Sequence, residues 1–71
     1  MTNKYQFTLF SKKYKPVACV VNATSRQEFV NKGKPYKDAL TKICIKRNWQ
    51  IKDLMEYGYT TWKVRKIEET S

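Results

Sequence analysis

The sequence predicts an α+β fold: an N-terminal antiparallel β-hairpin, a main amphipathic helix, a short helix and a third strand. Three patterns lead to this prediction. Apolar residues alternate near the start of the chain, recur every three or four positions in its middle, and give way to β-branched residues near its end. With 71 residues, the chain has room for a single small domain, residues 1–71.

The hairpin is predicted from two extended segments, residues 4–11 and 17–22. In the first segment, alternate apolar residues share one face, as in a half-buried strand, and Phe10 falls off that face. The residues of the apolar face are Tyr5, Phe7 and Leu9. The second segment is rich in β-branched residues, which predicts a more completely buried strand. A short polar connection favours antiparallel pairing of the two.

The middle of the chain predicts two helices. Ser25 and Glu28 have the spacing of a capping box, which indicates a short helix over residues 25–31. The main helix is expected over residues 35–48, because Pro35 suits the first turn and apolar residues follow at helical spacing. Its core-facing positions are Tyr36, Ala39, Leu40, Ile43, Cys44 and Arg47. Its opposite, mainly basic side carries Lys37, Thr41, Lys42 and Lys46.

A further short helix, residues 50–57, is predicted to end at Gly58, since glycine favours the turn after a helix. Its apolar positions are Ile51, Leu54, Met55 and Tyr57. Residues 60–67 are expected to form the third strand. Three strands covered by a helix are far more stable than an isolated hairpin. Alternation would put two apolar residues, Trp62 and Val64, on one side and two basic residues, Lys63 and Arg65, on the other.

The C-terminal region, residues 50–67, also resembles a helix-turn-helix, which leaves a hairpin followed by this motif as the alternative fold. Gly58 would form the turn, and the second helix would face the major groove of DNA. The residues presented to the groove would be Thr61, Trp62, Lys63, Arg65 and Lys66. The strand is preferred, because Leu54 stands where the motif normally has a small residue.

Charge is the strongest signal of function. Fifteen lysines and arginines oppose six acidic residues, for a net charge of +9, and the excess lies in residues 1–51. Such an excess destabilises the folded state by self-repulsion, and it favours polyanionic partners. Lysine dominates over arginine, which favours contact with phosphates over reading of base edges. The predicted nucleic-acid-binding residues are Lys12, Lys13, Tyr14, Lys15, Lys37, Lys42, Lys46, Lys63 and Arg65.

Catalysis is not expected. The chain has no histidine, the commonest general base near neutral pH, and no serine in a nucleophile elbow. Two isolated glycines do not form a phosphate-binding loop, and no cofactor or metal site is predicted. No apolar run approaches the roughly 20 residues of a membrane span, and the N-terminus lacks the pattern of a secretory signal. Cys19 and Cys44 are expected to be buried free thiols in a reducing cytoplasm, with a disulfide between them as the alternative.

Three stretches of sequence carry a resemblance: YQFTLFSKKYKPV at 5–17, ICIKRNW at 43–49 and KDLMEYGYTTWKVR at 52–65. They are similar to small basic proteins of phages and integrated elements in low-GC Gram-positive bacteria. The resemblance implies an accessory protein in the cytoplasm of a bacterial host.

The leading hypothesis is therefore a non-catalytic nucleic-acid-binding protein. The alternative is a protein-interaction module that binds and inhibits or recruits a host protein, with aromatic residues as anchors. The candidate anchors are Tyr57, Tyr59 and Trp62. Either a monomer or a homodimer paired through a sheet edge fits the sequence.

Overall fold

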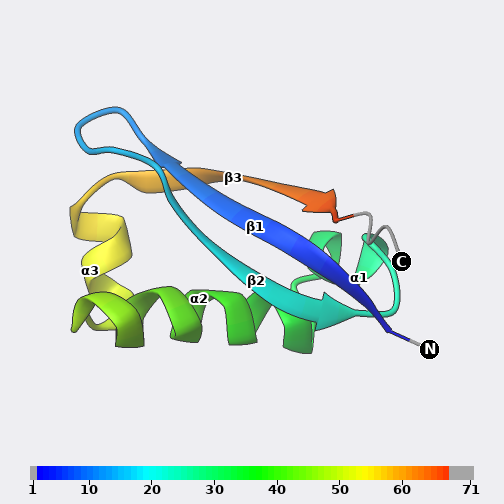
Figure 1. Ribbon diagram of the computed structural model, residues 1–71. Helices are drawn as coiled ribbons and strands as arrows, with labels where there is room; N and C mark the ends of the chain where they lie inside the picture. Colours follow the sequence, from blue (N-terminus) through cyan, green and yellow to red (C-terminus); the bar gives the residue numbers. More distant parts are fainter. Residues whose placement is uncertain (1, 68–71) are drawn as a thin grey trace.

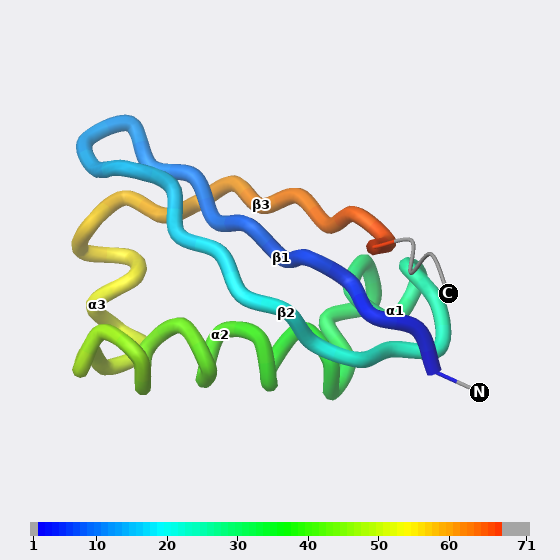
Figure 2. The backbone as a smooth tube through the Cα atoms, in the orientation of Figure 1, coloured from blue at the N-terminus to red at the C-terminus, as the bar shows by residue number. Residues whose placement is uncertain are grey.

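The computed structural model describes residues 2–67 and confirms the α+β fold, with one antiparallel sheet in the strand order β2-β1-β3 and three helices. The elements are β1 (Asn3–Ser11), β2 (Val17–Ala23), α1 (Gln27–Val30), α2 (Lys34–Arg47), α3 (Ile51–Glu56) and β3 (Tyr59–Lys66). Figure 1 shows α2 lying along the sheet, with α1 and α3 near its two ends. The backbone tube shows all three helices on the same side of the sheet (Figure 2).

The central strand, β1, supplies the middle of the core. Its alternating apolar residues lie between inward-facing residues of both neighbouring strands, so that Phe7 pairs with Cys19 on β2 and with Val64 on β3. The side chains of Phe7, Phe29 and Ile43 are fully buried. The predicted hairpin is therefore confirmed, and its apolar face is the face that the helices cover.

The main helix begins one residue earlier than predicted and ends at Arg47, one residue before the predicted end. Pro35 lies in its first turn, and Asn48 adopts a left-handed conformation with φ 59° at its C-terminus. The amide of Trp49 then donates to the carbonyl of Cys44 over 2.8 Å, which satisfies a terminal carbonyl of the helix. The buried residues of α2 are Pro35, Ala39, Ile43 and Cys44.

Two details of the short helices differ from prediction. Helix α1 is shorter than residues 25–31, and Ser25 does not cap it. Instead the Glu28 carboxylate accepts a hydrogen bond of 3.1 Å from the Thr24 amide. In α3, the predicted core positions Ile51 and Met55 are exposed, because a single turn and a half buries only Leu54 on its inner side.

Residues Tyr59–Lys66 form a strand, so the helix-turn-helix alternative is wrong. Gly58, with a φ of 78°, turns the chain out of α3, and β3 then pairs with β1 along its length. Because β3 gives β1 a second partner, the sheet has three strands covered by helices, which is far more stable than an isolated hairpin. Val64 is buried, whereas Lys63 and Arg65 are exposed on the opposite side.

Strand β2 is less buried than the sequence predicts. Val20 remains 42% exposed, because the helices cover one face of the sheet and β2 lies at its edge. A β-branched residue on the uncovered face therefore stays in contact with solvent.

Both cysteines are free thiols, as expected, although only Cys44 is buried and Cys19 is half-buried. Burial raises the pKa of the Cys44 thiol above its ordinary value of 9.0, and the negative charge of Asp53 raises it further. Burial also raises the pKa of Cys19, while Lys42 and Lys46 oppose that increase. Both groups are therefore neutral in the folded protein near neutral pH.

The raised pKa of Cys44 predicts that the protein loses stability in alkaline solution. Above about pH 9 the thiol of the unfolded chain loses its proton while the folded thiol keeps it. The unfolded state then binds fewer protons, so the free energy of unfolding falls as pH rises. Urea unfolding at about pH 7.5 and about pH 10 should show a larger decrease for the wild type than for Cys44→Ala. Equal decreases in the free energy of unfolding would contradict the raised pKa of Cys44 as the cause.

Candidate nucleic-acid interface

One face of the sheet has no helix against it. Alternation directs one set of side chains to this side, and we call their surface the open sheet face. It comprises Lys4, Gln6, Thr8 and Phe10 of β1, Ala18, Val20 and Asn22 of β2, and Thr61, Lys63 and Arg65 of β3. None of these residues is acidic. The surface therefore combines an uncovered sheet face (Figure 2) with positive charge.

The basic residues of β3 lie beside polar residues of β1. Lys63 pairs with Thr8 across the two strands, and Arg65 pairs with Gln6. The Arg65 guanidinium donates a hydrogen bond of 3.0 Å from Nη2 to Oε1 of Gln6, which holds it across the sheet. Because a guanidinium has five N–H donors, it can contact Gln6 and a phosphate oxygen together.

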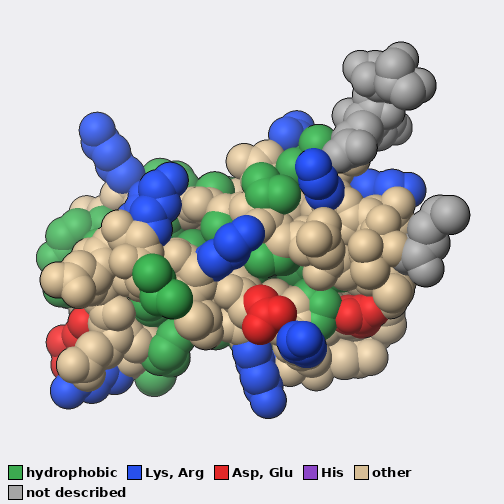
Figure 3. Space-filling view, turned by 60° about the horizontal axis from the view of Figure 1, so that its bottom comes forward, with side chains coloured by type: hydrophobic (Ala, Val, Ile, Leu, Met, Phe, Trp, Pro, Cys, Tyr) green, Lys and Arg blue, Asp and Glu red, His purple; other side chains and the backbone are tan. Residues whose placement is uncertain are grey.

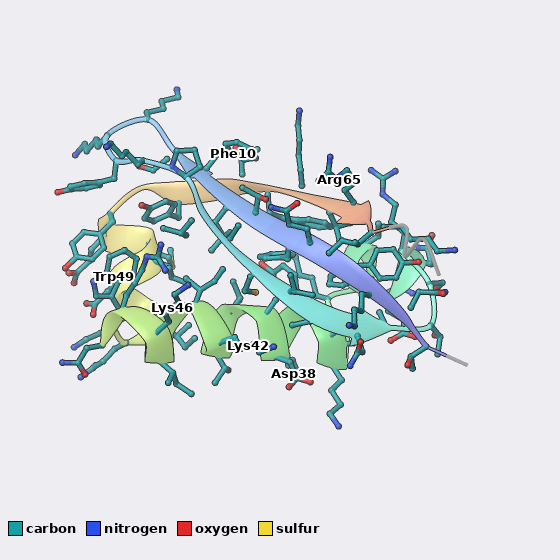
Figure 4. All side chains as sticks on the ribbon, viewed as in Figure 1. Phe10, Asp38, Lys42, Lys46, Trp49 and Arg65 are labelled. Carbon is teal, nitrogen blue, oxygen red and sulfur yellow. The ribbon has the colours of Figure 1, made fainter. Side chains whose placement is uncertain are left out.

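Phe10 is the aromatic residue of the open sheet face. It pairs with Thr61 near the end of β1, and its side chain is half-buried. Figure 4 shows Phe10 and Arg65 on the side of the sheet away from α2. A partly exposed ring beside cationic side chains suits stacking on an unpaired base while the cations contact the backbone.

The loop between β1 and β2 continues the basic surface beyond Phe10, and it is anchored at its base. The Ser11 hydroxyl donates to the carbonyl of Tyr57 over 2.6 Å. The same oxygen accepts hydrogen bonds from the amides of Lys13, at 3.0 Å, and Tyr14, at 3.3 Å. These bonds tie the loop to the end of α3.

Two aromatic contacts anchor the far side of this loop. The hydroxyl of Tyr59 donates to the carbonyl of Lys15 over 2.7 Å, and the rings of Tyr14 and Tyr57 meet edge-on with centroids 5.3 Å apart. The Tyr14 ring is 54% exposed, so it contributes both to the fold and to the surface. An ordered loop presents its cations with little loss of conformational entropy on binding. Those cations are Lys12, Lys13 and Lys15.

The three predicted lysines of α2 do not form one surface. Lys42 lies beside β2, where its ammonium donates to the carbonyl of Val20 over 2.6 Å, and Lys46 follows one turn later. Lys37 precedes Lys46 by about two and a half helical turns, so it lies on the opposite flank of the helix. The structure therefore divides the predicted site residues between the open sheet face, the loop, the β2 edge and the far side of α2.

Lys4, Gln6 and Thr8 belong to the candidate interface, although the sequence prediction did not include them. The period-two alternation of β1 already places them opposite its apolar face. What it does not show is that this face stays uncovered, because that depends on where the helices pack.

Within residues 2–67, no three histidine, cysteine, aspartate or glutamate side chains lie close enough together to hold a metal ion. None of the helices described is long and apolar enough to cross a membrane. No protein-family model, curated protein or solved structure matches the chain.

Proposed function

We propose that the protein is a non-catalytic nucleic-acid-binding protein that binds a single strand across the open sheet face. The observation that carries this proposal is a sheet surface without a covering helix, on which Lys63, Arg65 and Phe10 meet polar residues and no acid. Sheet surfaces of this kind bind unpaired bases by stacking and the phosphate backbone by charge.

A single strand fits this surface better than a duplex. The Phe10 ring can stack only on a base whose face is free, and the bases of a duplex are stacked on each other. The anchored loop with Lys12, Lys13 and Lys15 extends the path for phosphates beyond the sheet. The preponderance of lysine favours binding with little sequence preference. An accessory role in the bacterial cytoplasm, which the resemblance of residues 5–17, 43–49 and 52–65 implies, is part of the proposal.

Fluorescence anisotropy with labelled oligonucleotides tests the proposal. Single-stranded DNA or RNA of about 12 nucleotides should bind at about 50 mM salt, and the logarithm of the affinity should fall linearly with the logarithm of the salt concentration. The slope should be close to 0.7 for each phosphate contacted, or about 2 to 4 in total. No binding at low salt would overturn the proposal. Tighter binding of a duplex of equal length would overturn its single-strand part.

A further inference from the structure

A second surface lies along the outer edge of β2, where a groove separates this strand from α2. Two adjoining hollows of about 560 and 350 Å³ form the groove, and Lys42 lines both. The smaller hollow is lined by Ala18, Cys19, Val20, Lys42, Ile45 and Lys46. Figure 3, which brings this side forward, shows hydrophobic side chains exposed between lysine and acidic side chains.

The backbone of β2 offers hydrogen bonds to this groove. Within the described residues, β1 is the one strand that pairs with β2, so its outer edge has no ladder partner. In an antiparallel strand, alternate residues direct both their amide and their carbonyl to the same side. The carbonyl of Val20 points into the groove, where it accepts a hydrogen bond from the Lys42 ammonium. The backbone amides and carbonyls of Ala18 and Asn22 therefore point into the groove as well.

Lys42 occupies the position where the amide of an added strand would donate. Its side chain is exposed and its carbon chain is flexible, so the ammonium can exchange the Val20 carbonyl for another partner at little cost. A lysine at this place also protects the edge from unselective pairing. When the ammonium leaves the Val20 carbonyl, that carbonyl is free to accept an amide of the added strand, and Lys42 is free to bind a carboxylate.

The side chains around the groove define its ligand. Ile45 is 75% exposed and lines the smaller hollow, and Val20, whose side chain lies on the open sheet face, is 42% exposed beside the edge, so both sides of the edge offer apolar surface to a partner. Lys42 and Lys46 line the same hollow, and Figure 4 labels both on α2. An extended peptide that alternates acidic and apolar residues would direct its carboxylates toward the two lysines of α2 and its apolar side chains to the other face of the sheet, beside Val20.

We propose that the groove between β2 and α2 binds an acidic, extended peptide segment of another protein by strand addition to β2. A nucleic acid fits it less well, because a sugar-phosphate backbone cannot supply the row of amides and carbonyls that pairs with the open edge of β2. A second copy of the chain fits it less well too, because pairing two β2 edges would bring together the Lys42 side chains of both copies.

Selection from a library of random eight-residue peptides tests the proposal, with the full chain as bait. The enriched peptides should alternate acidic and apolar residues, and proline should be absent from their centres. Titration of the ¹⁵N-labelled protein with the best peptide should shift the amide signals of Ala18, Val20 and Asn22. Absence of enrichment, or shifts confined to β3, would overturn the proposal.

Charge reversal supplies a matched control. Lys42→Glu with Lys46→Glu should weaken the peptide at least about tenfold, whereas Lys37→Glu with Lys52→Glu makes the same charge change elsewhere and should have little effect. Equal weakening by both pairs would overturn the groove as the site. Light scattering shows whether the protein is a dimer. If it is, and if dimerisation shifts the amide signal of Val20, then a second copy of the chain and not a peptide occupies the groove.

Discussion

Replacement of Phe7 by alanine should leave most of the protein unfolded at room temperature. Phe7 has no exposed surface, and it lies on the central strand against three rings, with centroid distances of 6.0 Å to Phe29, 5.6 Å to Tyr36 and 5.5 Å to Trp62. Removal of a buried phenylalanine side chain costs about 3–5 kcal/mol. The core of a domain this small rarely supplies more than about 3–5 kcal/mol of net stability. The cost of this single substitution is therefore comparable to the entire free energy of unfolding.

Far-UV circular dichroism and urea unfolding would measure the effect, and the chain provides a matched control on the same strand. Phe10→Ala removes the same atoms from the opposite face, where the side chain is half-buried. That variant should remain folded, with the free energy of unfolding lowered by about 1 kcal/mol. A cooperative transition of Phe7→Ala at the wild-type urea midpoint would contradict the central position of this ring in the core.

The position of the core was predictable because it follows from local alternation. Tyr5, Phe7 and Leu9 share one face whatever the strands pair with, and the structure buries all three. The third strand followed from an energetic argument, since a hairpin alone is barely stable and residues 60–67 favour extended backbone. Both inferences need only short-range patterns and general stability considerations.

The order of the strands depends on long-range packing, and local patterns do not contain it. Strand β3 could have joined the hairpin beside β1 or beside β2, and the alternation of Trp62 and Val64 is the same in both cases. Because β3 pairs with β1, β2 becomes an edge strand and Val20 remains exposed. The groove between β2 and α2 is a consequence of that order.

The candidate interface was only partly predictable, because it too depends on long-range packing. Lys63 and Arg65 were selected from the sequence as exposed cations, and the structure places them on the open sheet face. The contribution of Gln6 could not be inferred, because its bond to Arg65 joins residues 59 positions apart. Lys42 could not be distinguished from other helix lysines until its hydrogen bond to the Val20 carbonyl was known.

Charge reversal on the open sheet face should nearly abolish binding of single-stranded oligonucleotides. Lys63→Glu with Arg65→Glu removes two cations that neutralise phosphates and replaces them with repulsion, so the affinity at about 50 mM salt should fall at least about tenfold. The salt slope should also decrease by about 0.7 for each phosphate that the variant no longer neutralises. Anisotropy titrations at several salt concentrations measure both quantities.

Comparison of three variant pairs with equal charge changes separates the two proposed surfaces. The open-face pair should no longer bind the oligonucleotide and should keep the peptide, because both side chains point away from the β2 groove. The groove pair, Lys42→Glu with Lys46→Glu, should show the reverse. The pair Lys37→Glu with Lys52→Glu should change both affinities by less than about threefold, since it alters the net charge alone. If all three pairs weakened the oligonucleotide equally, total charge and not the open sheet face would govern binding.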